Sequence, residues 1–144
     1  MKNKKSFFAS LFCAWRTVNL PSMNIFISRD GLNSLLTKGN LRAAVDVQVN
    51  IKFKRRKAIT EIVEKFGHLY LTDPEQLQMK IEDMLIDKLK LVVYRTTSQE
   101  FKNNKKKVVL DLIKELEKEK WMTIVYVDIS KLSQTKWATI PQLC

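Results

Sequence analysis

Residues 45–53 alternate strictly between apolar and polar side chains. Their sequence, VDVQVNIKF, has valine, isoleucine or phenylalanine at every odd position and a polar residue at every even one. This period of two predicts a strand with one buried face and one exposed face. The strand leads directly into KRRK, which is Lys54, Arg55, Arg56 and Lys57. A strand that ends in four adjacent cations favours a partner made of phosphates.

The positive charge of the chain is concentrated in its first part. Residues 1–57 contain twelve Lys or Arg and two acids, whereas residues 58–144 contain fourteen Lys or Arg and thirteen acids. Solvated surface charge is the alternative interpretation, but it gives no reason for the excess to lie at one end. A chain of 144 residues accommodates one ordinary domain. We therefore expect a basic N-terminal arm over residues 1–40 and a single domain over residues 41–144.

Residues 1–29 contain no acid and have the composition of an organelle-targeting segment. The apolar stretch within it, Phe7–Trp15, is shorter than the roughly 18 residues of a membrane span. The sequence leaves open whether this segment is cleaved, is retained as an arm or belongs to a chain made inside the organelle. Cys13 and Cys144 have no metal-ligand spacing, and we interpret them as free thiols in a reducing compartment. These features predict a mitochondrial or other organelle-matrix location.

The rest of the chain mixes strand and helix patterns. The helix expected over residues 73–85 begins at Asp73, a natural N-cap followed by Pro74. The expected fold class is α+β, with a mixed sheet of about four strands covered by two or three helices and a basic extended N-terminal arm. Further helices are expected over residues 32–38, 59–66 and 105–119, and strands over residues 24–27, 88–94, 121–129 and 136–140, with residues 68–71 either a short strand or a linker.

Support for catalysis is weak. His68 is the one histidine, and no nucleophile pattern surrounds it. Three glycines in the whole chain leave little room for a nucleotide-binding loop. Glu115, Glu117 and Glu119 have the spacing of a solvated helix face. We expect no enzymatic activity, cofactor, metal or small-molecule ligand.

The basic clusters are the remaining candidates for a binding site. Two adjacent arginines in the first cluster can make forked contacts with phosphate. A second cluster lies near the start of a helix, where cations oppose the helix dipole, which favours a functional role. Phe7, Phe8, Phe12 and Trp15 fit stacking on exposed bases or insertion into a protein groove. The predicted RNA-binding residues are Lys2, Lys4, Lys5, Arg16, Lys52, Lys54, Arg55, Arg56, Lys57, Lys105, Lys106 and Lys107.

The segment from Ile86 to Glu119 reads IDKLKLVVYRTTSQEFKNNKKKVVLDLIKELEKE. It is similar, without a gap, to the central strand, turn and second helix of the C-terminal domain of translation initiation factor 3, and residues 73–137 as a whole resemble that domain. The family's turn contains glycine and arginine, whereas residues 96–99 here are Thr-Thr-Ser-Gln. The resemblance implies a helix and strand module that binds the small ribosomal subunit. The positions with similar residues are Asp87, Lys88, Lys90, Leu110 and Lys114.

The sequence therefore predicts a non-enzymatic RNA-binding protein, a structural protein of a mitochondrial ribosome. Its partners would be rRNA and neighbouring proteins of a large complex, with the basic residues neutralising RNA backbone. One alternative is a dissociable factor similar to translation initiation factor 3. Another is an accessory subunit of an organellar protein or membrane complex, with residues 7–15 docking on a protein or a bilayer.

Overall fold

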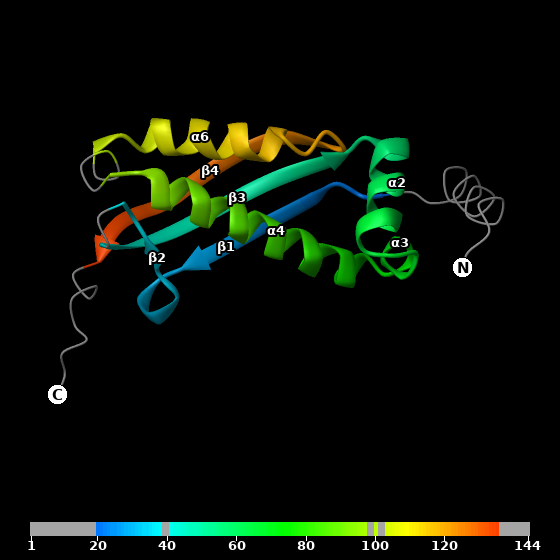
Figure 1. Cartoon of the computed structure of the whole chain (residues 1–144), viewed down its shortest axis with the longest axis horizontal. Helices are drawn as coiled ribbons and strands as arrows, with labels where there is room; N and C mark the ends of the chain where they lie inside the picture. Colours follow the sequence, from blue (N-terminus) through cyan, green and yellow to red (C-terminus); the bar gives the residue numbers. More distant parts are fainter. Residues whose placement is uncertain (1–19, 39–40, 98–99, 101–102, 136–144) are drawn as a thin grey trace.

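The computed structural model describes residues 20–38, 41–97, 100 and 103–135 of the chain. Three strands and the short helix η1 come first, the α-helices follow one after another, and the longest strand closes this part of the chain (Figure 1). The elements are β1 (Met23–Arg29), the short 3-10 helix η1 (Gly31–Asn33), β2 (Leu35–Leu36), β3 (Arg42–Phe53), α2 (Arg55–Lys65), α3 (Leu69–Thr72), α4 (Pro74–Arg95), α6 (Lys105–Glu117) and β4 (Met122–Thr135).

The sheet is built around β3, which is the strand predicted from the alternating pattern. β1 pairs with one side of β3 from Met23↔Ile51 onward, and β2 continues that side beside Arg42 and Ala43. β4 follows the other side of β3 along its full length. All pairs between these strands are antiparallel, so the α+β class is confirmed while the sheet is antiparallel rather than mixed.

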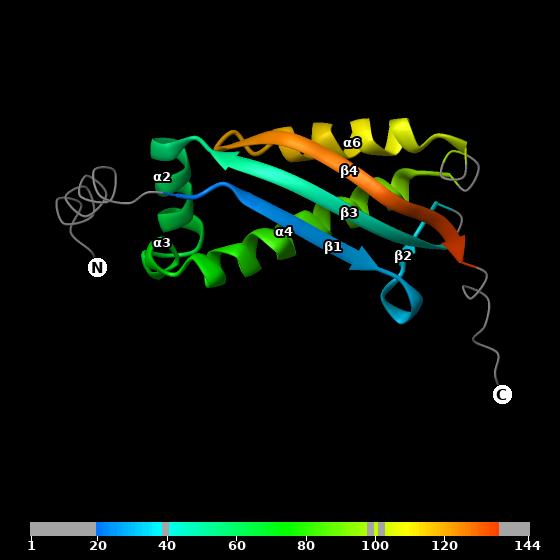
Figure 2. The ribbon, with the colours of Figure 1, turned by 180° about the vertical axis from the view of Figure 1, so that it is seen from behind.

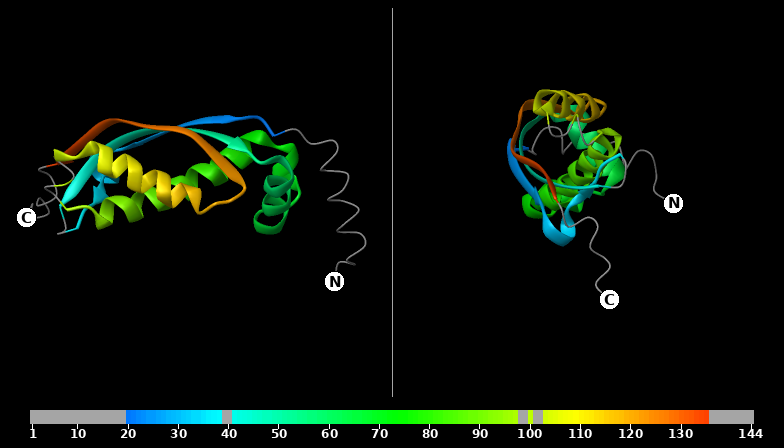
Figure 3. Two further views of the ribbon diagram at one scale, coloured as in Figure 1. Left: turned by 90° about the horizontal axis from the view of Figure 1, so that it is seen from above. Right: turned by 90° about the vertical axis from the view of Figure 1, so that its left-hand side faces the viewer.

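Helices α4 and α6 lie side by side over one face of the sheet, and the sheet curves around them (Figure 3). The odd-numbered positions of β3 point into this layer, and Val45, Val47, Val49 and Ile51 are at most 1% exposed. Leu89 of α4 and Leu112 of α6 pack against the same core. The β3 pattern therefore predicts correctly which face of the sheet is buried.

The opposite face of the sheet has no helix over it among the described elements (Figure 2). Polar side chains from adjacent strands face each other there. Ser28 Oγ donates a hydrogen bond to Asp46 Oδ1 at 2.6 Å, and Gln48 Nε2 donates one to Asn24 Oδ1 at 3.0 Å. Phe26 lies among them and is 58% exposed. Tyr126 is also exposed there and donates a hydrogen bond to Asn24 Oδ1 at 3.4 Å, so this face combines paired polar side chains with two exposed aromatic rings.

Part of the segment expected to be an arm belongs to the sheet. In β1, residues 23–29, buried and exposed side chains alternate, and Ile25 is fully buried. The helix expected over residues 32–38 is wrong, because the chain there forms η1 and then β2. Residues 68–71 overlap the short helix α3 instead of forming a strand. The C-terminal strand expected over residues 136–140 lies outside the described residues.

The strand expected over residues 88–94 is also wrong, because α4 continues to Arg95. Leu89, Val92 and Val93 are buried, whereas Leu91 is 46% exposed. This spacing of i, i+3 and i+4 belongs to a helix face and extends the buried stripe of the preceding turns. The resemblance to translation initiation factor 3 implies a strand at these residues, and the structure has a helix.

The predicted N-cap of the same helix is confirmed, since the backbone N–H of Gln76 donates to Asp73 Oδ1 at 3.3 Å.

Candidate anion-binding surface at one end of the fold

The end of β3 and the start of β4 are held together at one end of the molecule. The backbone N–H of Lys54 donates to the carbonyl of Trp121 at 2.9 Å, and the Phe53 and Trp121 rings stack with centroids 5.9 Å apart. Helix α2 begins at the next residue, Arg55. Its first turn therefore lies beside residues 118–121, although the two segments are more than sixty residues apart in the sequence.

These two segments form the walls of a surface cavity of about 480 Å³. One wall is a face of α2, and the other is the connection from α6 to β4. The indole of Trp121, which is 2% exposed, closes the cavity on its inner side. We call this region the basic end. The lining residues are Arg56, Lys57, Thr60, Glu61, Lys65, Lys118, Glu119, Lys120 and Trp121.

The carboxylates of the basic end are already engaged with cations. Glu119 accepts a hydrogen bond from Trp121 Nε1 at 2.9 Å, and its oxygens lie 3.3 Å from Lys65 Nζ and 3.5 Å from Lys88 Nζ. Burial acts to raise the pKa of Glu119, but the indole and the two lysines outweigh it and hold that pKa below its usual value. Glu61 lies 3.6 Å from the same Lys65 Nζ.

Glu115 fixes the underside of the same connection. It accepts hydrogen bonds from Lys118 Nζ at 3.0 Å and from Arg95 at 2.6 Å, and these two partners hold the pKa of Glu115 below its usual value. Lys88 Nζ donates to the carbonyl of Glu115 at 3.1 Å. Helix α4 is thereby tied to the last turn of α6, which positions the connection that carries Lys118 and Lys120.

The first turn of α2 is cationic where helices ordinarily favour acids. Lys54, Arg55, Arg56 and Lys57 are exposed, and this turn contains no acid. Positive side chains there oppose the helix dipole, so an anion bound beside them would improve the local electrostatics. The first turn of α2 therefore gives this end of the fold a concentrated positive charge.

The predicted RNA-binding residues fall into separate places. Residues 54–57 lie at the basic end, and the structure adds Lys118 and Lys120, which the sequence did not single out. Lys52 points to the open sheet face and is exposed. The predicted cations Lys2, Lys4, Lys5 and Arg16 lie outside the described residues.

The second predicted cluster lies at the other end of α6 (Figure 1). Lys105, Lys106 and Lys107 form the first turn of that helix, about 18 Å along its axis from its last residue. Lys107 Nζ lies 2.9 Å from Glu100, and this hydrogen bond raises the pKa of Lys107 and lowers that of Glu100. The two basic clusters are therefore distinct surfaces.

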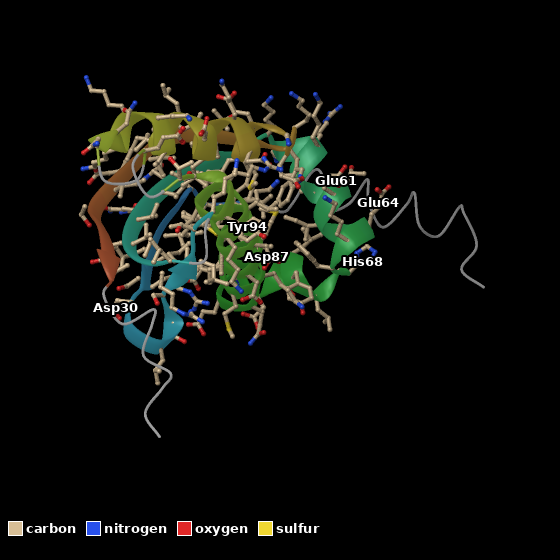
Figure 4. All side chains as sticks on the ribbon, turned by 60° about the vertical axis from the view of Figure 1, so that its left-hand side comes forward. Asp30, Glu61, Glu64, His68, Asp87 and Tyr94 are labelled. Carbon is tan, nitrogen blue, oxygen red and sulfur yellow. The ribbon has the colours of Figure 1, made fainter. Side chains whose placement is uncertain are left out.

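The other chemically reactive side chains are spread over the molecule. Figure 4 shows Glu61, Glu64 and His68 along the α2 end, Asp87 and Tyr94 on α4, and Asp30 at the distant turn after β1. No set of three or more His, Cys, Asp or Glu side chains within the described residues is placed to hold a metal ion. No helix in the same residues is long and apolar enough to cross a membrane.

Comparison with known proteins gives one informative similarity. No protein-family model matches the chain, and no solved structure matches it. The flotillin family inner membrane protein YqiK of Escherichia coli (strain K12) is 27% identical to it over 93 residues. The aligned part covers 64% of this chain but 17% of the relative, so the chain spans about a sixth of that protein's length.

Proposed function

We propose that this chain is an interaction module of a membrane-associated protein assembly and that its basic end binds the anionic lipid surface. The observation that carries the proposal is the joining of two cationic segments, residues 54–57 and residues 118–120, around one cavity. Concentrated cations on one end of a small fold orient the molecule toward a negatively charged surface.

The direction in which the chain enters the fold supports the same arrangement. Met23 pairs with Ile51, two residues before the end of β3, so β1 begins at the basic end. The sequence that precedes it is free of acids and combines Lys2, Lys4, Lys5 and Arg16 with the apolar stretch 7–15. Basic and bulky apolar residues together are typical of segments that bind membrane interfaces.

The similarity to a flotillin family inner membrane protein favours this proposal over the other functions that the sequence suggested. The relative's description places that protein in a membrane. For this chain the same association is a proposal, and it revives the membrane-complex alternative of the sequence analysis. The chain would act through its surfaces, as a module that positions other parts of an assembly.

Vesicle co-sedimentation of the full chain tests the proposal. We expect binding to vesicles that contain phosphatidylglycerol, little binding to neutral phosphatidylcholine vesicles, and weaker binding as salt rises. The variant K54Q/R55Q/R56Q/K57Q should bind anionic vesicles up to about a thousandfold more weakly, at about 1 kcal/mol for each cation near the surface.

The matched control removes the same number of charges outside the cavity lining, three of them in the first turn of α6 at the other end of that helix. The variant K105Q/K106Q/K107Q/K114Q changes exposed residues of α6 and should retain most of the binding. Equal losses in the two variants would show that net charge decides binding rather than the basic end. Equal binding to neutral and anionic vesicles would contradict the proposal.

A second candidate is RNA binding, as in a structural protein of a mitochondrial ribosome or a factor similar to translation initiation factor 3. The presence of two basic clusters, one at each end of α6, favours it, because an extended RNA can contact phosphates along the length of a protein. Arg55 and Arg56 can also make forked phosphate contacts.

Salt dependence of RNA binding distinguishes this second candidate. The logarithm of the affinity should fall by about 0.7 to 0.9 per phosphate contact for each tenfold rise in salt. Both four-residue variants should then flatten the slope, since both clusters would contact RNA. RNA that co-purifies and cross-links to residues 1–57 would support this function, and its absence with vesicle binding intact would exclude it.

A further inference from the structure

The cavity at the basic end contains more positive charge than its own carboxylates neutralise. Five cations and two carboxylates line it, and one of the cations, Lys118, is paired with Glu115 outside the lining. Lys65 Nζ forms an ion pair with both carboxylates, at 3.6 Å from Glu61 and 3.3 Å from Glu119. Lys88, which does not line the cavity, also forms an ion pair with Glu119. Lys57 and Lys120 form no ion pair with any described residue. The uncompensated charge is thus located on opposite walls, on α2 and on the connection to β4.

The walls are held in place by contacts that do not involve those two lysines. The hydrogen bond from Lys54 N to Trp121 O and the stacking of Phe53 on Trp121 fix the start of α2 against the start of β4. Glu119 is fixed by the Trp121 indole. A site whose supports are independent of its ligand-facing groups keeps its shape before a ligand arrives.

We propose that this cavity is a binding site for a phosphate monoester. A monoester carries close to two negative charges near neutral pH and offers three strong acceptor oxygens. Lysines on two facing walls can each donate to a different oxygen. A phosphate diester carries one charge and has two free oxygens, so it satisfies fewer of these donors.

The size and floor of the cavity agree with a small head group. Its volume of about 480 Å³ is in the range of pockets that hold small molecules, and it exceeds what a phosphate needs. The Trp121 ring forms the floor, and Lys65 Nζ lies 5.9 Å from its centroid. An anion bound to the lysines would therefore change the electrostatic field at the indole.

This proposal deepens the proposed membrane function and rests on it for the location of the anionic surface. The shared chemistry is the phosphate monoester group, and it can come from a soluble phosphate compound or from a lipid head group such as phosphatidic acid. The experiment separates these two sources.

The test uses the full chain with W15F/W137F, which leaves Trp121 as the one tryptophan. Glycerol phosphate and inorganic phosphate are added at constant ionic strength, and dimethyl phosphate serves as the diester. We expect a saturable change in Trp121 emission with the monoesters and at least about tenfold weaker binding of the diester. The variant K57Q/K120Q should weaken monoester binding by at least about tenfold, and the matched variant K105Q/K106Q should leave it unchanged.

Vesicles then assign the source. Preference for phosphatidic acid over phosphatidylglycerol at equal surface charge identifies a lipid head group, and monoester binding without that preference identifies a soluble ligand. No saturable response to monoesters, by emission and by calorimetry, would overturn the proposal, as would equal affinity for dimethyl phosphate or no effect of K57Q/K120Q. Binding of RNA without monoester binding would overturn the cavity proposal. Binding of phosphatidylglycerol vesicles without monoester binding would also overturn it, but the proposed membrane function would stand.

Discussion

The second half of α4 offers a sharp test of the fold, because the helix and a strand expose different residues there. In a strand over residues 88–94, Leu89, Leu91 and Val93 would share one face and Val92 would point away. In the helix, Leu89 and Val92 are 1% and 2% exposed, and Leu91 is 46% exposed. Substitution of Leu91 and Val92 by alanine should therefore have opposite outcomes under the two arrangements.

The expected magnitudes follow from these exposures. Leu89→Ala removes fully buried methyl groups and leaves a cavity, so it should destabilise the fold by about 2–5 kcal/mol. Val92→Ala removes two buried methyl groups and should cost about 2 kcal/mol. Leu91→Ala changes a half-exposed side chain and gains helix propensity, so its effect should stay within about 0.5 kcal/mol.

Urea unfolding and thermal unfolding, both followed by circular dichroism, measure these differences. At about 3 °C per kcal/mol for a chain of this size, Leu89→Ala should lower Tm by about 6–15 °C, and Leu91→Ala by less than about 2 °C. An unchanged slope with urea would show that the variants differ in stability and not in compactness. A large loss of stability in Leu91→Ala, together with no loss in Val92→Ala, would contradict the helix and support a strand over residues 88–94.

Other predictions concern the cap, the first strand and the acid response. Asp73→Ala removes the bond to the Gln76 N–H, so it should cost about 1 kcal/mol in urea unfolding, whereas a change below about 0.3 kcal/mol would argue against a capping role. Ile25→Ala should lower the free energy of unfolding by about 2–5 kcal/mol and Phe26→Ala by under about 0.5, since these side chains are 0% and 58% exposed. Equal effects would contradict the packing of β1 in the sheet. Glu119→Gln should cost about 1–2 kcal/mol at pH 7. Because the folded pKa of Glu119 is lowered, its contribution is present above the unfolded pKa of about 4.3 and is lost as pH falls through the folded value, so wild type and Glu119→Gln should converge in acid.

The alternating pattern of residues 45–53 predicted β3 because nine residues in strict alternation fit the period of a strand and not the period of a helix. The same criterion failed at residues 88–94, where KLKLVVY alternates at its start and also fits a helix with Leu89, Val92 and Val93 inward. Seven residues are too few to distinguish the period of a strand, two residues, from the period of a helix, about 3.6 residues. The preceding stripe of Leu77, Ile81 and Leu85 continues in step with Leu89, so the whole of α4 decides the period.

The length of the sheet also decides how far α4 runs. A twelve-residue strand such as β3 is about 40 Å long, and a helix of 22 residues is about 33 Å long. If α4 ended near residue 85, much of the buried face of β3 would face water. The helix continues because the strand beneath it is long, and that length results from pairing with β4, which lies about 70 residues later in the chain. Local sequence does not contain this information.

The composition of the basic end depends on the same pairing. Lys118 and Lys120 belong to a charge-balanced stretch, and nothing in their neighbourhood distinguishes them from solvated surface. They become part of the cavity because Phe53 pairs with Met122, which brings the residues before β4 beside the residues after β3. A register shift of two residues would move Trp121 away from Phe53 and separate the two walls by about 7 Å. The binding surface is therefore a consequence of sheet register, and mutations that loosen the β3–β4 pairing should weaken anion binding even when every lysine is kept.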